Sequence, residues 1–157
     1  MFSPMYPGAA LAMMLLGATV AAGVTTENVK TENAKPMREV AVALEEAGYG
    51  PIVDLSMDDG VWEAEAYRDG KALELTVDPQ TAEVLTEHRD DAEQKPPQEA
   101  KTLSELLASL EEAGFSDVTE ASFERRYWEI EASQGAERLE LHVDPVNGKV
   151  VSQRADD

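Results

Sequence analysis

The chain has 157 residues, no cysteine and a formal net charge of -19 at neutral pH. This excess of carboxylates disfavours nucleic acids and anionic membranes as partners, because both would be repelled. It favours basic peptides, basic protein surfaces or loosely held divalent cations, and it also suits a surface that only keeps the protein soluble. Without cysteine there is no disulfide to stabilise a small domain and no thiol to carry a lipid anchor.

The first 26 residues differ from the rest because they contain no Asp, Glu, Lys, Arg or His. The run of apolar or small residues at 9–24 is too short to span a bilayer but suits a signal-peptide core. Val20 and Ala22 place small side chains at a signal-peptidase site, although no basic residue precedes the apolar run. We expect a signal peptide over residues 1–23, or an N-terminal anchor if it stays uncleaved, and a flexible spacer over 24–35. The protein would then be periplasmic or secreted.

From residue 36 onward the same 56-residue unit occurs twice, displaced by 66 positions, with 20 identities between residues 36–91 and 102–157. Self-similarity at a fixed displacement indicates a duplicated structural unit. We therefore predict repeat 1 over residues 36–91 and repeat 2 over 102–157. A proline-containing linker over 92–101 would join them. Two residues are called equivalent below when their numbers differ by 66.

Each repeat is predicted to begin with an amphipathic helix. In repeat 2 the apolar residues Leu103, Leu106 and Leu110 recur at helical spacing. Thr102 and Glu105 have the spacing of a capping box, in which each side chain satisfies the other's backbone N–H. A glycine follows each helix directly, where a left-handed residue commonly ends a helix.

Three or four short strands are predicted to follow each helix. Trp62, Ala64 and Ala66 alternate with Glu63 and Glu65, and the same alternation returns 66 residues later. Period-two alternation predicts one buried and one wet face, with the tryptophans in the core. The expected fold class is α+β, with two tandem units that each pack one helix on a 3-4-stranded antiparallel sheet. Further strands are expected at residues 52–57, 73–77 and 83–87 and at 118–123, 139–143 and 149–153.

The turn before the last strand distinguishes the repeats. In repeat 2 it contains Asn147 and Gly148, which tolerate positive φ, whereas repeat 1 has Ala82 in place of the glycine. If the two backbones are the same, Ala82 is strained. We expect the substitution Ala82→Gly to stabilise repeat 1 on this basis.

The order of these motifs resembles the PepSY domain, here in tandem. The pattern is a helix ending in Glu-Ala-Gly-Tyr/Phe, a strand with Trp-Glu-x-Glu-Ala, and a turn with Val-Asp-Pro-x-x-Gly-Lys-Val, from which repeat 1 departs at Ala82. The resemblance implies an exported bacterial protein with a helix-on-sheet fold that binds or restrains peptidases and has no enzymatic activity. The tandem layout is also similar to beta-lactamase inhibitor protein, whose paired sheets grip another protein.

The candidate binding surface is the wet face of the predicted sheets. Its carboxylates could receive a basic peptide or a metal, or only keep the sheet soluble. Arg125 and Arg126 have no basic counterparts in repeat 1, and with Tyr127 they have the composition of an interface hot spot. The predicted binding residues are Glu63, Glu65, Tyr67, Arg125, Arg126, Tyr127, Glu129 and Glu131.

The motifs of catalysis and cofactor binding are missing from the sequence. It contains no Gly-x-Ser-x-Gly elbow, no glycine-rich phosphate loop and no twelve-residue calcium loop. Its two histidines, His88 and His142, are not equivalent, and no His-x-x-His spacing predicts a metal site. We therefore predict no catalytic residue, no cofactor and no metal.

The predicted function is that of an exported, non-catalytic binding or regulatory protein that restrains a peptidase or binds another envelope protein. Its partner would be a protein or peptide, with no nucleic acid, and no membrane unless the N-terminal segment is uncleaved. Two alternatives remain open, namely an acidic divalent-cation-binding or stress-sensing protein and an N-terminally anchored accessory subunit of a membrane complex. The sequence leaves the oligomeric state and the relative orientation of the repeats undetermined.

Overall fold

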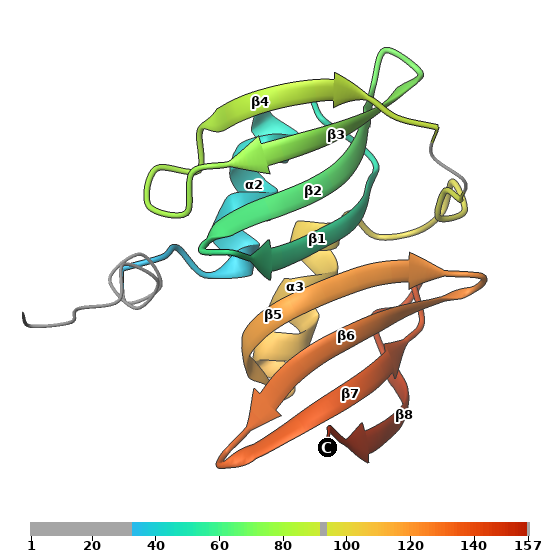
Figure 1. Ribbon diagram of the computed structural model, residues 1–157. Coiled ribbons are helices and arrows are strands. Elements are labelled where there is room, and N and C mark those ends of the chain that lie inside the picture. Colours follow the sequence, from blue (N-terminus) through green and yellow to red (C-terminus); the bar gives the residue numbers. More distant parts are fainter. Residues whose placement is uncertain (1–32, 92–93, 157) are drawn as a thin grey trace, which may run out of the picture.

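The computed structural model describes residues 33–91 and 94–156 (Figure 1). The expected signal peptide and nearly all of the expected spacer lie outside these residues. Within the described ranges, no helix is both long and apolar enough to cross a bilayer. The elements of the first repeat are α2 (Met37–Glu46), β1 (Ile52–Asp58), β2 (Val61–Arg68), β3 (Lys71–Val77) and β4 (Val84–Arg89). Those of the second are α3 (Leu103–Glu112), β5 (Ser116–Glu124), β6 (Tyr127–Gln134), β7 (Glu137–Val143) and β8 (Val150–Ala155).

The strands of both repeats form one continuous antiparallel sheet. Their order is β4-β3-β2-β1-β5-β6-β7-β8, so the first strand of each repeat lies in the middle. Both helices lie behind the same face of this sheet (Figure 1). The α+β class is confirmed, with four strands in each half. We call the face covered by helices the inner face and the opposite one the outer face.

The junction between β1 and β5 has the register of an approximate two-fold axis. Leu55 pairs with Ala121, and these two residues are equivalent. Asp54 pairs with Ser122, the equivalent of Ser56, and Ser56 pairs with Glu120, the equivalent of Asp54. The two repeats are therefore related by a rotation about an axis near Leu55 and Ala121, in the manner of an isologous dimer interface within one chain.

The helices contact each other about the same axis. The guanidinium of Arg38 on α2 donates to the Glu111 carboxylate on α3 at 3.0 Å. The equivalents of these two residues also meet, because the Ser104 backbone N–H and hydroxyl at the start of α3 donate to the Glu45 carboxylate. The two contacts occupy equivalent positions but differ in kind: Arg38 and Glu111 form an exposed ion pair, whereas Glu45 caps the start of α3.

The helix ends confirm the sequence reading. Thr102 and Glu105 form both hydrogen bonds of the capping box. Gly48 and Gly114 follow the helices with φ of 90° and 92°. In each repeat the glycine N–H donates to the carbonyl of Glu45 or Glu111, and the next backbone N–H donates to the carbonyl of Leu44 or Leu110. This pair of bonds is the Schellman motif, which turns the chain back toward the sheet.

The inner face and both helices enclose a single apolar core. Trp62 and Trp128 are 3% and 1% exposed, so the prediction that they are core residues is confirmed. Leu55 and Ala121 at the junction belong to the same buried cluster. No polar or charged residue among those described is buried. Because the core crosses the junction, the repeats stabilise each other by apolar burial.

The turn before the last strand has the same left-handed backbone in both repeats. Ala82 has φ of 63° and Gly148 has φ of 71°, as the sequence comparison required. However, Ala82 is only 8% exposed and its methyl group packs in the core. A Cβ on Gly148 would meet the Ser109 side chain at 3.1 Å, and the equivalent of Ser109 is the smaller Ala43. Replacing Ala82 by glycine would therefore relieve strain but lose a buried methyl group.

Candidate functional site

The outer face carries matching carboxylates in the two repeats. Glu63 and Glu65 on β2 and Glu74 on β3 project from repeat 1, and the first two lie directly across from Thr76 and Glu74 in the ladder. All three glutamates are exposed. Repeat 2 has the equivalent set, Glu129, Glu131 and Glu140, on β6 and β7. The predicted acidic outer face is therefore present, and it extends across both halves of one sheet.

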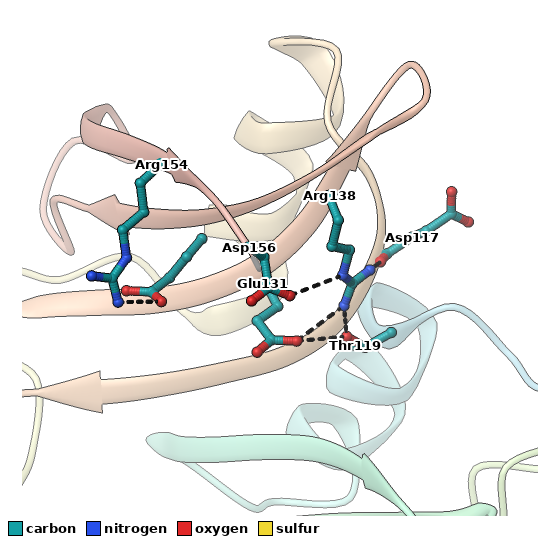
Figure 2. A network of polar contacts seen from close by, with 7 residues as sticks. Asp117, Thr119, Glu131, Arg138, Arg154 and Asp156 are labelled. Atoms are coloured by element: carbon teal, nitrogen blue, oxygen red, sulfur yellow. Dashed lines mark hydrogen bonds and ion pairs between the residues drawn. The ribbon is translucent and has the colours of Figure 1, made fainter.

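In repeat 2 an arginine neutralises part of this acidic row. Arg138 of β7 lies beside both Glu131 and Asp156 (Figure 2). Its guanidinium is 3.2 Å from the Glu131 carboxylate and 4.0 Å from that of Asp156. The same guanidinium donates to the Asp117 backbone carbonyl and to the Thr119 hydroxyl. It thus holds the strands β5, β6 and β7 and the end of the chain together on the outer face.

Two further side chains contact the carboxylates of the remaining glutamates of repeat 2. Arg154 of β8 donates to the Glu140 carboxylate at 2.6 Å (Figure 2). The His142 Nε2 atom lies 3.5 Å from Glu129 Oε1 and 3.8 Å from Glu140 Oε1. The Glu140 side chain is accordingly only 22% exposed.

Repeat 1 lacks these neutralising residues. The equivalents of Arg138, His142 and Arg154 are Ala72, Thr76 and His88. The side chains of Glu63 and Glu74 make no hydrogen bond or ion pair with any other residue in the described ranges. Glu129 and Glu140 are thus held in contacts within repeat 2, whereas their equivalents Glu63 and Glu74 are available to solvent or a partner in repeat 1.

The central strands add carboxylates whose protonation is perturbed. Burial raises the pKa of Asp54 on β1, although the Ser122 hydroxyl donates to it and partly opposes the shift. Burial also raises the pKa of its equivalent, Glu120 on β5, and the nearby carboxylates of Glu131 and Asp54 add to the effect. Both groups therefore favour the neutral form more than ordinary carboxyl groups do.

Tyr67 does not lie on the open face, which corrects the prediction. It has the strand parity of Glu63 and Glu65, but it is only 7% exposed. The Nζ atom of Lys95 in the linker lies 3.8 Å from the centre of its ring, so the linker covers it. Burial, with Asp90 and Glu65 nearby, raises the pKa of its hydroxyl. The alternation of residues in β2 gave the side of the sheet correctly but could not reveal this cover.

The structure places the predicted Tyr-Arg cluster at the turn between β5 and β6. Arg125 and Arg126 are exposed, and Arg125 has φ of 56°. Tyr127 begins β6 on the outer face, with the Arg126 guanidinium 5.4 Å from its ring centre. Its ring is nearly parallel to that of His142, at an angle of 5° and a centroid distance of 6.4 Å. This cluster therefore borders the neutralised row of repeat 2 rather than the glutamates of repeat 1.

A hollow of about 440 Å³ opens on the outer face near the linker. Its lining includes the carboxylates of Asp54, Glu65, Asp90, Asp91 and Glu124. These residues come from β1, β2, β5 and the segment after β4, so the hollow exists only because the repeats share one sheet. Alternation along single strands predicted the side of each glutamate. It did not predict this cluster, because its members meet across the junction.

The family of the chain follows from both repeats. The family described as peptidase propeptide and YPEB domain, one of the PepSY group, matches residues 8–88 and again residues 90–154. The chain belongs to this family and carries its domain twice, so the resemblance predicted from the sequence motifs is confirmed. No protein of curated function matches the chain significantly.

The solved structures to which the chain is similar are distant from it in sequence. A "putative lipoprotein" from Clostridium difficile 630 is 18% identical over 83% of this chain and 99% of its own, with a TM-score of 0.44. A BLIP-like protein from Bacteroides fragilis NCTC 9343 is 15% identical over 81% of this chain and 91% of its own, with a TM-score of 0.31. A DUF2874 family protein from Bacteroides uniformis ATCC 8492 is 15% identical over 77% and 89%, with a TM-score of 0.28. Likenesses at this distance say nothing about binding or activity.

Proposed function

We propose that this protein is a non-catalytic binding protein whose outer sheet face in repeat 1 receives a basic segment of a partner protein. The observation that carries the proposal is the exposed pair Glu63 and Glu74, whose side chains have no partner among the described residues. Their equivalents Glu129 and Glu140 face His142 and Arg154 instead. A face that retains its carboxylates but loses its own cations is complementary to a positively charged ligand.

The family supports a peptidase as the partner. Its description names the propeptides of peptidases, which are segments that accompany an enzyme before its maturation. A domain that binds and restrains a peptidase needs surface complementarity and no reactive group of its own. The apolar interior and the surface confinement of every charged residue described agree with such a role.

Export from the cytoplasm would place the protein in the same compartment as an exported peptidase. The apolar run before residue 24 and the small residues Val20 and Ala22 support a cleaved signal peptide. Mass spectrometry of the mature N-terminus tests this directly. A chain that begins near residue 23 or 24 supports export, whereas retention of the whole segment would favour the anchored accessory subunit.

Binding can be tested with a defined probe, a short fluorescein-labelled peptide of alternating lysine and alanine, followed by fluorescence anisotropy. An extended peptide of this pattern presents its lysines on one side, opposite the glutamates of the sheet. The double substitution Glu63→Lys with Glu74→Lys should weaken binding roughly tenfold, as expected for two surface ion pairs of about 0.7 kcal/mol each. Raising the salt concentration should weaken binding of the unsubstituted protein in the same direction.

Two matched controls change the net charge by the same amount elsewhere. One reverses Glu129 and Glu140, the equivalents in repeat 2, and the other reverses Glu46 and Glu112 on the exposed sides of the helices. Both control variants should weaken peptide binding much less than the double substitution in repeat 1 does. Equal losses in all three variants would show that only the overall charge matters, and the proposed face would be rejected.

Divalent-cation binding is the second candidate function, and the hollow with five carboxylates favours it. Asp54, Glu65, Asp90, Asp91 and Glu124 supply the oxygen ligands that calcium prefers. Calorimetry with calcium at moderate salt separates a site from a diffuse acidic surface. Stoichiometric heat that disappears in the variant Asp90→Asn with Asp91→Asn would support a cation-binding function, and weak, non-saturating heat would contradict it.

A further inference from the structure

The cluster of His142, Glu129 and Glu140 on the outer face of repeat 2 has the composition and spacing of a metal site. One donor atom from each of these residues lies within 4.8 Å of the other two. We propose that these three side chains bind a divalent transition metal, with zinc as the best match. This site is separate from the basic-peptide face of repeat 1, so either proposal can fail without the other.

The distances are close to those of a coordinated ion. The His142 Nε2 atom is 3.5 Å from Glu129 Oε1 and 3.8 Å from Glu140 Oε1. Zinc bonds of about 2.0–2.2 Å in a tetrahedron separate neighbouring donor atoms by about 3.3–3.5 Å. The two distances from His142 need to shorten by only a few tenths of an ångström to reach that spacing, and the two glutamate oxygens lie within 4.8 Å of each other. A solvent molecule can complete the fourth position, since Glu129 and His142 are 46% and 40% exposed.

The sheet fixes the three ligands relative to one another. Glu129 on β6 and His142 on β7 are direct partners in the ladder, and Glu140 lies two residues before His142 on the same face. Cross-strand partners stand roughly 5 Å apart at Cβ, and residues two apart on one strand are next nearest. No sequence motif reports this arrangement, because the spacing between residues 129 and 142 depends on the length of the hairpin between them.

Neighbouring side chains orient the ligands as an outer shell would. Arg154 holds the Oε2 atom of Glu140 at 2.6 Å and leaves Oε1 directed toward His142. The Tyr127 ring lies nearly parallel to the imidazole of His142, with 6.4 Å between the ring centroids. Such hydrogen-bonded and packed support is typical of ligating carboxylates and histidines.

Repeat 1 supplies a matched control within the same protein. It has both glutamates, Glu63 and Glu74, in the same register, but Thr76 replaces the histidine. The substitution His142→Thr therefore copies the repeat 1 residue into the proposed site, and Thr76→His copies the ligand into repeat 1. Both positions are on the outer face, away from the core, so neither change should alter folding.

The test is a titration of the full chain with zinc chloride, followed by calorimetry and by NMR of the imidazole rings. The protein has two histidines, and His88, outside the cluster, serves as the internal reference. We expect one saturable equivalent of zinc, a shift of the His142 ring signals without a comparable shift of those of His88, and loss of the equivalent in His142→Thr. The variant Thr76→His should bind a second equivalent.

Four results would overturn the proposal. These are no saturable heat, equal shifts of both imidazoles, an unchanged equivalent in His142→Thr, and no added equivalent in Thr76→His. Thermal unfolding of the metal-free variants checks that each remains folded. If His142→Thr failed to fold, the conservative variant Glu129→Gln would replace it, and zinc binding unaffected by that change would also reject the site.

Discussion

The two repeats keep the same core and differ on their surfaces. Trp62 and Trp128 are both buried, and the turns with Ala82 and Gly148 share one backbone conformation. On the outer face the shared glutamates are paired with Arg138, Arg154 and His142 in repeat 2, whereas repeat 1 has Ala72, His88 and Thr76 at these positions. The duplicated unit thus preserved what folding requires, while the pairing of its carboxylates changed.

A second difference lies beside the core, on the helix side of the sheet edge. In repeat 1 the Tyr49 hydroxyl donates to Glu87 and accepts from Arg68, both at 2.8 Å. Arg68 also pairs with Glu87 at 2.7 Å. The equivalents in repeat 2 are Phe115, Gln134 and Gln153, so all three members differ together. A polar network that changes as a set indicates that its members act together, since one member alone would leave polar groups unpaired.

The largest expected effect tests whether the shared core makes the repeats unfold as one. Replacing either tryptophan by alanine should cost about 3–5 kcal/mol, a large part of the stability of a small domain. Trp62→Ala leaves Trp128 as the only tryptophan, so its fluorescence reports on the untouched repeat, and Trp128→Ala gives the converse. Urea unfolding followed by fluorescence and by circular dichroism should give coincident transitions. Separate transitions would show that the repeats are independent.

The turn difference should produce the next largest effect. Gly148→Ala combines left-handed strain with the 3.1 Å contact to Ser109, and we expect a loss of about 1–3 kcal/mol in stability. Adding Ser109→Ala, which copies Ala43 of repeat 1, should restore part of the loss. Ala82→Gly should change stability by less than about 0.5 kcal/mol, because relief of strain is offset by a lost buried methyl group. Urea denaturation of the four proteins, unsubstituted included, gives these values.

The stabilisation of repeat 1 by Ala82→Gly that sequence comparison predicts is therefore expected to be small or absent. The sequence reveals that Ala82 stands where a glycine is favoured, but not that its methyl group is buried in the core. If Ala82→Gly raised stability by more than about 1 kcal/mol, strain would outweigh packing at this turn. If Ser109→Ala failed to rescue Gly148→Ala, crowding by Ser109 would not be the reason that repeat 2 requires glycine.

A smaller effect is expected for the polar network of repeat 1. Tyr49→Phe should cost about 0.5–1.5 kcal/mol, the usual net value of a hydrogen bond. In a background with Arg68→Gln and Glu87→Gln, which copies repeat 2, the same change should cost much less. A double-mutant cycle by chemical denaturation measures this coupling. Equal costs in both backgrounds would mean that the hydroxyl does not depend on its charged neighbours.

The smallest effect concerns pH and the junction. Because burial raises the pKa of Asp54 in the folded state, its ionisation costs stability at neutral pH. Asp54→Asn should therefore stabilise the protein at pH 7. The gain in stability from Asp54→Asn should shrink as the pH falls from the raised pKa of the folded state toward the ordinary pKa of the unfolded state. Below both pKa values, Asp54 is protonated in the folded and the unfolded protein alike. Thermal unfolding across this range, with the exposed Asp58→Asn as control, checks the sign. A stability gain from Asp54→Asn that increases as the pH falls would contradict this prediction.

Sequence reasoning captured the parts of the fold that depend on local patterns. Helical spacing located both helices, the glycines located their ends, and period-two alternation assigned Glu63 and Glu129 to the wet face. The sequence did not predict that the two sheets join through Leu55 and Ala121, because its pattern does not show which strand edges pair and which remain free. The cover of Lys95 over Tyr67 depends on the path of the linker, which has no periodic pattern.

The candidate site was predicted only in its general character. Alternation identified an acidic outer face, but the pairing of each carboxylate depends on the register between strands. Arg138 and Arg154 were not singled out, because their contacts with Glu131 and Glu140 cross from one strand to the next. One signal could have identified them. Both are basic in repeat 2 where repeat 1 has Ala72 and His88, a difference that alignment of the repeats displays.

The most direct test of the account is to map where a basic ligand binds on the folded protein. Isotope-labelled protein would be titrated with the lysine-alanine peptide, and the backbone amide shifts of all strands would be followed. Saturable shifts centred on Glu63, Glu74 and Thr76, with little change at Glu129 and Glu140, are predicted. Shifts of equal size in both repeats, or shifts centred on the helices, would contradict the claim that repeat 1 carries the binding face.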